Sequence, residues 1–165
     1  MARGILTGKG EKMPKLMAAL AVGVLAAALG PVASAQERAP AVFVAALSAE
    51  NEVPGCAPGE ESGAEGRAIV RIDEETGQIT YRVVARRLPG TIAGSPGAHI
   101  HVGAAGEAGP VVQPLELTGR DRGLVATGTA TNPALAEAIL ADPANYYVNV
   151  HTTVCPAGAI RGQLG

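Results

Sequence analysis

The sequence predicts an all-β fold, an antiparallel β-sandwich with Greek-key-like connections and one short helix near 132–141. Three observations lead to this fold class. Short apolar or alternating runs recur along the chain, loops rich in glycine and proline separate them, and only one segment has a helix signal. The 22 glycines and 12 prolines supply turns at regular spacing, which is typical of sandwiches and barrels.

The first expected strand is the apolar run 42–48, which is followed by a loop, 49–55, with proline, glycine and acidic residues. The runs 66–73 and 78–87 flank the short glycine-containing gap 74–77, which indicates a hairpin. Alternate residues of the second run are apolar, as a half-buried antiparallel strand requires. These residues are Ile79, Tyr81, Val83 and Ala85.

Further strands are expected at 98–102, 111–117, 123–130, 146–152 and 159–164. The helix is expected between the runs 123–130 and 146–152, where Asn132 can cap its start and Pro133 suits its first position. Asp142 and Pro143 end it. No internal repeat or linker divides this region.

Residues 1–35 are expected to be a signal peptide rather than part of the fold. A basic leader precedes the uncharged run 16–29, and Ala33-Ser34-Ala35 is a pattern that signal peptidase accepts. A membrane anchor is the alternative, but the run is shorter than the roughly 20 residues that span a bilayer. We therefore expect cleavage after Ala35, a single secreted or otherwise extracytoplasmic domain at 36–165 in the periplasm or at the cell surface, and no remaining membrane span. Translation could also begin at Met13.

The expected domain is acidic and contains no lysine. Four of the 13 basic residues and one of the 15 acidic residues lie in 1–35, which leaves nine arginines, 14 acidic residues and a net charge of −5. This balance argues against nucleic acid or anionic lipid as a partner bound through bulk charge. Aromatic residues are scarce, so neither a glycan-binding site nor a protein-interface hot spot is strongly indicated. The expected partner is an extracellular protein or small ligand of unknown identity.

Cys56 and Cys155 are the two cysteines of the chain. In an exported protein, the expected state is one disulfide, which would join the first long loop to the loop before the last strand. The alternative is that Cys155 is a metal ligand near His151.

The three histidines of the chain lie in two expected strands. His99 and His101 are two residues apart and therefore share a face, and Asn149 and His151 share a face of the later strand. If the two strands are neighbours, the three imidazoles converge and could hold zinc or copper. The alternative is a polar cluster with Thr152 that fastens strands through hydrogen bonds or lines a ligand site. The candidate fourth ligands are Glu50, Glu52 and Glu107.

Other chemistry is less well supported. No serine lies in a nucleophile-elbow context. A hydrolase that uses the acidic residues at 60–65 would need a paired-carboxylate cleft, and no aromatic platform accompanies them. We therefore expect no catalytic residues.

Four blocks in order carry a family resemblance: 43–48 with 52–54, 98–103, 147–152 and 158–164. Together they resemble the chordin-type (CHRD) domain over about residues 42–165. The resemblance implies an extracellular β-sandwich-like module without an established enzymatic activity. In chordin the domain accompanies growth-factor-binding repeats, which this chain lacks, so that activity is not carried over. The family usually has Glu where this chain has Ala159, which removes a possible ligand or partner of Arg161.

The strand with His99 and His101 also resembles, locally, the metal-binding strand of copper/zinc superoxide dismutase, another sandwich. Two hypotheses follow. The first is a secreted, non-catalytic binding or structural module of the CHRD type with a polar site at His99, His101, Asn149, His151 and Thr152. The second is a metalloprotein that binds copper or zinc through His99, His101 and His151, with dismutase-like redox chemistry as its possible activity.

Overall fold

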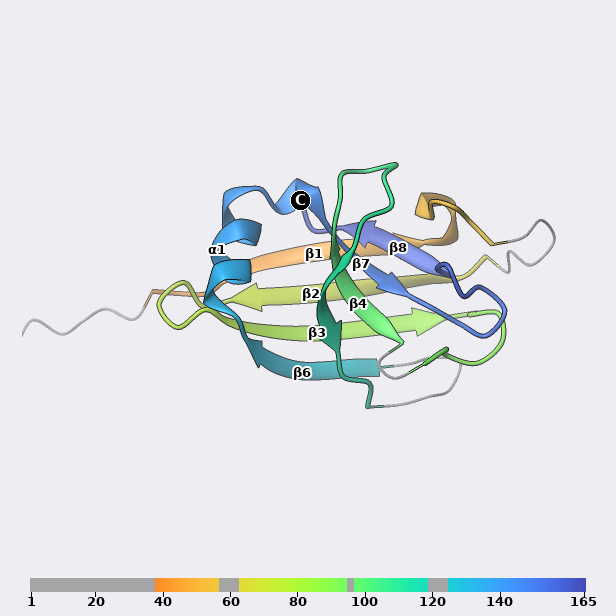
Figure 1. The fold of residues 1–165 in the computed structure, drawn as a ribbon. Helices are drawn as coiled ribbons and strands as arrows, with labels where there is room; N and C mark the ends of the chain where they lie inside the picture. Colours follow the sequence, from red (N-terminus) through yellow and green to blue (C-terminus); the bar gives the residue numbers. More distant parts are fainter. Residues whose placement is uncertain (1–37, 57–62, 95–96, 119–124) are drawn as a thin grey trace, which may run out of the picture. The chain divides into compact units, whose positions relative to one another are not determined.

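The computed structural model describes residues 38–56, 63–94, 97–118 and 125–165. They form eight strands and one α-helix (Figure 1). The strands are β1 (Ala41–Ser48), β2 (Glu65–Ile72), β3 (Gln78–Arg86), β4 (Ala98–Val102), β5 (Val111–Leu115), β6 (Val125–Thr131), β7 (Tyr146–Val150) and β8 (Ile160–Gln163). The helix α1 spans Pro133–Ala141, and two 3-10 turns span Ala49–Asn51 and Pro143–Asn145. The predicted all-β class with one short helix is confirmed.

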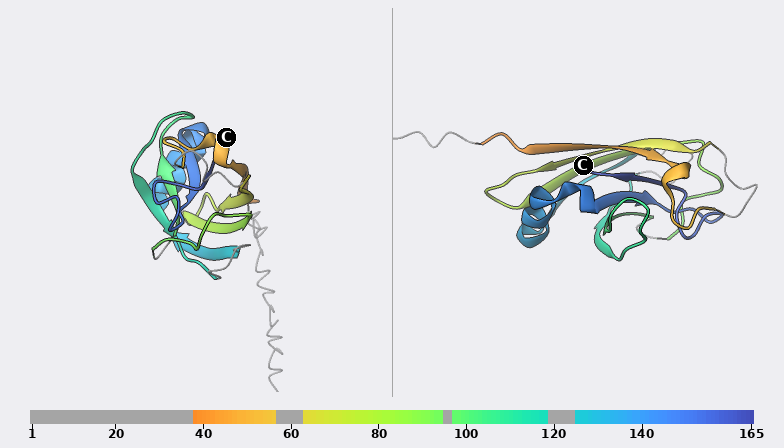
Figure 2. Two further views of the ribbon diagram at one scale, coloured as in Figure 1. Left: turned by 90° about the vertical axis from the view of Figure 1, so that its right-hand side faces the viewer. Right: turned by 90° about the horizontal axis from the view of Figure 1, so that it is seen from above.

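All strand pairs are antiparallel, in the order β5-β4-β7-β8-β1-β2-β3-β6. β1 pairs with β2 over eight residues but with β8 only through Ser48 and Arg161, so the sheet folds over at β8 and β1. A bridge between Leu117 and Ala126 brings the other two edges together. The result is two facing layers, β5-β4-β7-β8 and β1-β2-β3-β6, which the right-hand view of Figure 2 shows from the edge.

The core lies between the inner faces of these layers. Residues alternate between buried and exposed along β3, as the sequence pattern predicts for a strand with one solvated face. Side chains with no more than 3 % exposure come from both layers and include Val70, Ile72, Ile79, Tyr81, Val83, Ile100, Val148, Val150 and Ile160. Burial of these aliphatic side chains is the main stabilising term of such a fold.

Local chemistry explains where several elements end. The side chain of Asn132 accepts a hydrogen bond from the Leu135 amide (3.2 Å) and caps α1, as predicted. β3 ends where Arg87 adopts a φ of 56°, a left-handed conformation that breaks the ladder. β5 is an edge strand, which tolerates Pro114 because one side of it needs no ladder donor.

The expected signal peptide at 1–35 lies outside the described residues, as do the acidic residues Glu60 and Glu61. In the described part of the chain, no helix has both the length and the apolar character that crossing a membrane would require.

Candidate metal site

The outer face of the β4–β7–β8 layer is polar. His99 is paired with Asn149 across β4 and β7. His101 is paired with Tyr147 in the same ladder, and Asn149 is paired with Arg161 on β8. Directly paired residues point to the same side of a sheet, so these side chains form one layer. We define the polar layer as His99, His101, Tyr147, Asn149, Arg161 and Gln163, together with His151, which follows β7.

The three histidines lie together in this layer. Their ring centroids are 5.5 Å apart for His99 and His101, 5.0 Å for His99 and His151, and 5.8 Å for His101 and His151. One potential ligand nitrogen from each ring lies within 4.8 Å of the others. The pairing of β4 with β7 therefore brings together residues that are 50 positions apart in the chain.

Two of the rings are oriented by backbone carbonyls. Nδ1 of His101 lies 2.9 Å from the carbonyl oxygen of Gly109, and Nδ1 of His151 lies 3.1 Å from that of Pro156. A carbonyl can only accept, so Nδ1 carries the proton in both rings and Nε2 has a free lone pair. Both Nε2 atoms are buried and have no hydrogen-bond partner among the described residues. This is the arrangement that second-shell carbonyls impose on metal-binding histidines.

Burial also favours the neutral form of these rings. Desolvation lowers the pKa of His101 below its usual value, although the bond to Gly109 opposes the shift, and the charges of His151 and Arg161 add to it. Burial lowers the pKa of His151 in the same way, against the bond to Pro156. Neutral imidazoles at pH 7 are the form that binds a metal ion.

Tyr147 lies between His101 and Arg161. Its ring is stacked on the His101 ring, with centroids 4.8 Å apart and an interplanar angle of 13°. The Arg161 guanidinium carbon lies 3.4 Å from the Tyr147 ring centroid. Because β7 lies between β4 and β8, the two neighbours occupy opposite faces of the tyrosine ring. The stack fixes the position of His101 within the layer.

Arg161 holds the loop between β4 and β5 over the polar layer. It is 2 % exposed, and its guanidinium donates to the carbonyls of Glu107 (2.6 Å) and Ala104 (2.7 Å) and to the side chain of Gln163 (3.0 Å). These neutral acceptors satisfy the cation. Ala159 is buried in the core.

Glu52 is a buried carboxyl that contacts the polar layer at Asn149. The Asn149 side-chain amide donates to Glu52 Oε2 (3.3 Å). Burial raises the pKa of Glu52 to about 8, against the lowering effects of Arg161 and of the Asn149 bond, so the group is largely neutral at pH 7. Gly158 has a φ of +151° and leaves room for both side chains, because a Cβ there would overlap the Glu52 carboxylate and the Asn149 amide.

A disulfide joins Cys56 to Cys155, with their Cα atoms 5.1 Å apart, so the predicted pairing is present. It links the loop that carries Glu52 to the loop that follows His151. The alternative that Cys155 is a metal ligand is wrong, because its sulfur is in the disulfide and offers no thiolate.

The remaining candidate site residues lie outside the three-histidine group. Thr152 is fully buried, and its hydroxyl accepts from the Cys155 amide (3.0 Å), so it stabilises the turn after His151. In the described part of the chain, the group of potential ligand atoms contains the three histidines and no carboxylate. Glu50 and Glu107 are therefore not in the group, and Glu52 is bonded to Asn149 instead.

A comparison with protein-family models identifies the family of this chain. A model of the CHRD domain matches residues 43–164. The chain belongs to the CHRD-domain family. No curated protein and no solved structure matches it. The CHRD match contains every residue of the polar layer and both disulfide cysteines, so the candidate site lies within this CHRD domain.

Sequence reasoning missed several functional features of this CHRD domain. The carbonyls of Gly109 and Pro156 orient two histidines, but backbone acceptors have no sequence signal. The stacking partner Tyr147 was visible only as a residue on the same face as Asn149. The burial of Glu52 was not foreseen, because the acidic, proline-containing context of 49–55 is typical of an exposed loop.

Proposed function

We propose that this protein is an exported CHRD module that binds one divalent transition-metal ion, zinc or copper, through His99, His101 and His151. The observation that carries the proposal is the pair of buried Nε2 atoms of His101 and His151, which have no protein partner among the described residues and belong to the same three-histidine group.

A purely structural role explains this arrangement less well. A histidine that only fastens strands would use both ring nitrogens in hydrogen bonds, because a buried polar atom without a partner costs free energy. In His101 and His151 only Nδ1 is bonded, to a backbone carbonyl. A metal ion would give the second nitrogen of each ring its partner.

Three neutral imidazoles suit zinc or copper more than magnesium or calcium, which prefer oxygen ligands. Three protein ligands also leave a fourth position of a tetrahedral ion for water or a small ligand. When bound, zinc would supply a Lewis acid, whereas copper would supply a one-electron redox couple. The chain's own residues orient the imidazoles of His101 and His151 and favour their neutral form.

Export is supported by three features. The leader and the small-residue pattern at 33–35 favour signal cleavage. A disulfide persists best in an oxidising compartment. The CHRD domain is itself an extracellular type of module. No residue of the polar layer is proposed to be catalytic.

The test is a measurement of metal content and affinity on protein purified without a histidine tag. We expect about one zinc or copper ion per chain, and we expect His101→Ala and His151→Ala to reduce affinity by at least 100-fold. Cobalt substitution should give the intense visible absorption of a tetrahedral site. The matched control is Gln78→Ala. Gln78 is exposed on β3, which four strands separate from β4 in the sheet order, so this variant should bind metal as the wild type does.

Folding of each variant is checked by circular dichroism and by its thermal midpoint without metal. A folded wild-type protein that binds neither ion with a Kd below about 100 μM contradicts the proposal, as does binding that both histidine variants retain. If only copper binds, an assay of superoxide dismutation with the copper-loaded protein and with His101→Ala tests the redox alternative directly.

A further inference from the structure

The second layer presents a cationic face on the outside of the molecule, and we propose that it binds a linear acidic polysaccharide through Arg67, Arg71 and Arg82. This site lies on β2 and β3, in the other layer from the three histidines, and it does not depend on the metal proposal.

The register places the three arginines around one aliphatic residue. Arg82 is paired with Ile69, and Arg67 and Arg71 are two residues before and after Ile69 on β2. All three therefore point to the outer face, and all three are exposed. At about 3.3 Å per residue, Arg67 and Arg71 are about 13 Å apart along the strand, with Arg82 diagonal to both on the neighbouring strand.

These three cations have no carboxylate partner among the described residues, in which the ion pairs are Arg38 with Glu74, and Arg86 and Arg87 with Glu65. Glu65 is thus shared by two other arginines at the end of the same face. The remaining residues that the register places beside the three arginines are uncharged: Val42, Val44, Ala46, Thr80, Val84 and Thr127. Among the described residues, no ion pair therefore neutralises the charges of Arg67, Arg71 and Arg82.

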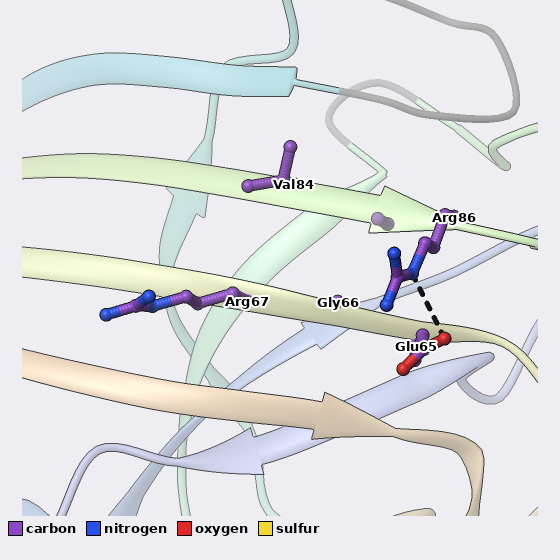
Figure 3. Close-up of a pocket in the computed structure, with 6 residues that line it drawn as sticks. Glu65, Gly66, Arg67, Val84 and Arg86 are labelled. Carbon is purple, nitrogen blue, oxygen red and sulfur yellow. Dashed lines mark ion pairs between the residues drawn. The ribbon is translucent and has the colours of Figure 1, made fainter.

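A shallow groove of about 250 Å³ marks one end of this face. Glu65, Gly66, Arg67, Val84, Ala85 and Arg86 line it. Figure 3 shows Arg86 turned toward Glu65, to which it is ion-paired, whereas Arg67 extends along the strand away from that pair. The groove thus has one neutralised end, at Arg86 and Glu65, and one available guanidinium, that of Arg67.

The surface suits a flexible polyanion better than a folded protein. The exposed large apolar side chains on it are those of Val42 (52 % exposed) and Val44 (48 %), which are neighbours on β1, and of Val84 (36 %) on β3. No aromatic residue lies at the described outer-face positions of β1, β2, β3 and β6, so the anchors typical of protein interfaces are missing. Three like charges spaced over two neighbouring strands match a polymer that repeats a carboxylate along its length.

Arginine is the appropriate cation for this partner. Its planar guanidinium can donate two parallel hydrogen bonds to one carboxylate. The nine arginines of 36–165 supply all of its basic side chains apart from histidine, and four of them, Arg67, Arg71, Arg82 and Arg86, lie on the outer face of β2 and β3. The net negative charge of the domain therefore coexists with a local cationic face.

The experiment measures binding of the purified protein to fluorescently labelled polygalacturonate by anisotropy in 20 mM salt. The test variant is R67S/R71S/R82S. The control variant, R38S/A134E/A141E, has the same net charge but is altered only at exposed positions outside the face. We expect the test variant to lose at least tenfold in affinity, the control to remain within threefold of the wild type, and wild-type binding to weaken steeply by 200 mM salt.

Other outcomes would overturn the proposal. One is that the wild-type protein does not bind polygalacturonate, and another is that the test and control variants lose affinity equally. The third is that the wild type binds poly-L-glutamate at least tenfold more tightly than polygalacturonate, which would identify an acidic polypeptide as the occupant. Thermal unfolding checks that the triple variant is folded, and the single variant Arg82→Ser replaces it if it is not. In that case a loss of less than twofold contradicts the assignment.

Discussion

The side chains of His101 and Tyr147, paired across β4 and β7, both bond to the same residue, Gly109. The His101 ring donates to its carbonyl (2.9 Å), and the Tyr147 hydroxyl accepts from its amide (3.0 Å). Tyr147 thus holds the loop residue that orients the histidine, in addition to stacking on the ring. This arrangement makes Tyr147 a positioning residue for the proposed metal site.

Tyr147→Phe tests that role while keeping the ring. Loss of the hydroxyl removes two hydrogen bonds to Gly109, one accepted from its amide (3.0 Å) and one donated to its carbonyl (3.3 Å), and should lower the free energy of unfolding by about 1–2 kcal/mol. It should also weaken zinc binding by about tenfold, as second-shell changes do. Tyr81→Phe is the matched control, because its hydroxyl also accepts from a backbone amide, that of Glu116 (2.8 Å), but in the core. Competition with a zinc chelator should show weaker affinity for Tyr147→Phe alone; equal affinities would contradict the role.

Glu52 should make stability depend on pH. The folded protein keeps the proton of this carboxyl up to about pH 8, whereas the unfolded chain releases it near 4.5. The contribution of neutral Glu52 is therefore fully present below pH 4.5 and is lost as pH rises through about 8.

Glu52→Gln should remove this dependence. Urea unfolding at pH 5 and at pH 8.5 measures the free energies of both proteins, and their difference cancels the titration of the histidines. We expect the free energy of unfolding of the variant, relative to that of the wild type, to be higher at pH 8.5 than at pH 5. A difference that is constant with pH would mean that Glu52 titrates at its ordinary value.

Gly158→Ala should destabilise the protein by about 1–3 kcal/mol, since it combines a strained backbone with overlap on Glu52 and Asn149. Gly106→Ala is the control, because Gly106 also has a positive φ, of +82°, but has no atom within 4 Å of the added Cβ. Chemical unfolding of both variants separates the cost of the strained backbone, which both share, from the cost of the overlap, which only Gly158→Ala has. If they are equally destabilised, the packing around Glu52 does not matter.

Loss of the disulfide should lower the free energy of unfolding by roughly 2–4 kcal/mol, because the bond closes a loop of 99 residues in the unfolded chain. Thermal unfolding with and without reducing agent measures the change, and Cys56→Ala/Cys155→Ala should reproduce it without reductant. Mass spectrometry under non-reducing conditions provides the check. Two free thiols in the isolated protein would show that the bond does not form.

Much of the fold could be predicted from local pattern. The alternation in 78–87 identified β3 and its buried face, and the Asn132-Pro133 signal identified the start of α1. These features depend on side-chain period and capping, which neighbouring residues determine. Strand ends were less accurate: 111–117 was expected, but β5 ends at Leu115, and Leu117 instead bridges to Ala126 in the other layer.

The sequence by itself determined that His99 and His101 share a face, that Asn149 and His151 share another, and that two cysteines were available to pair. Only the tertiary structure decided that these faces are one surface, because strand order is set by long-range pairing of β4 with β7. It also decided that Gly109 and Pro156 orient the rings, that Glu52 is buried, and that Arg67, Arg71 and Arg82 gather outside β2 and β3. Proximity between distant segments follows from how layers pack their apolar faces, and no local period encodes it.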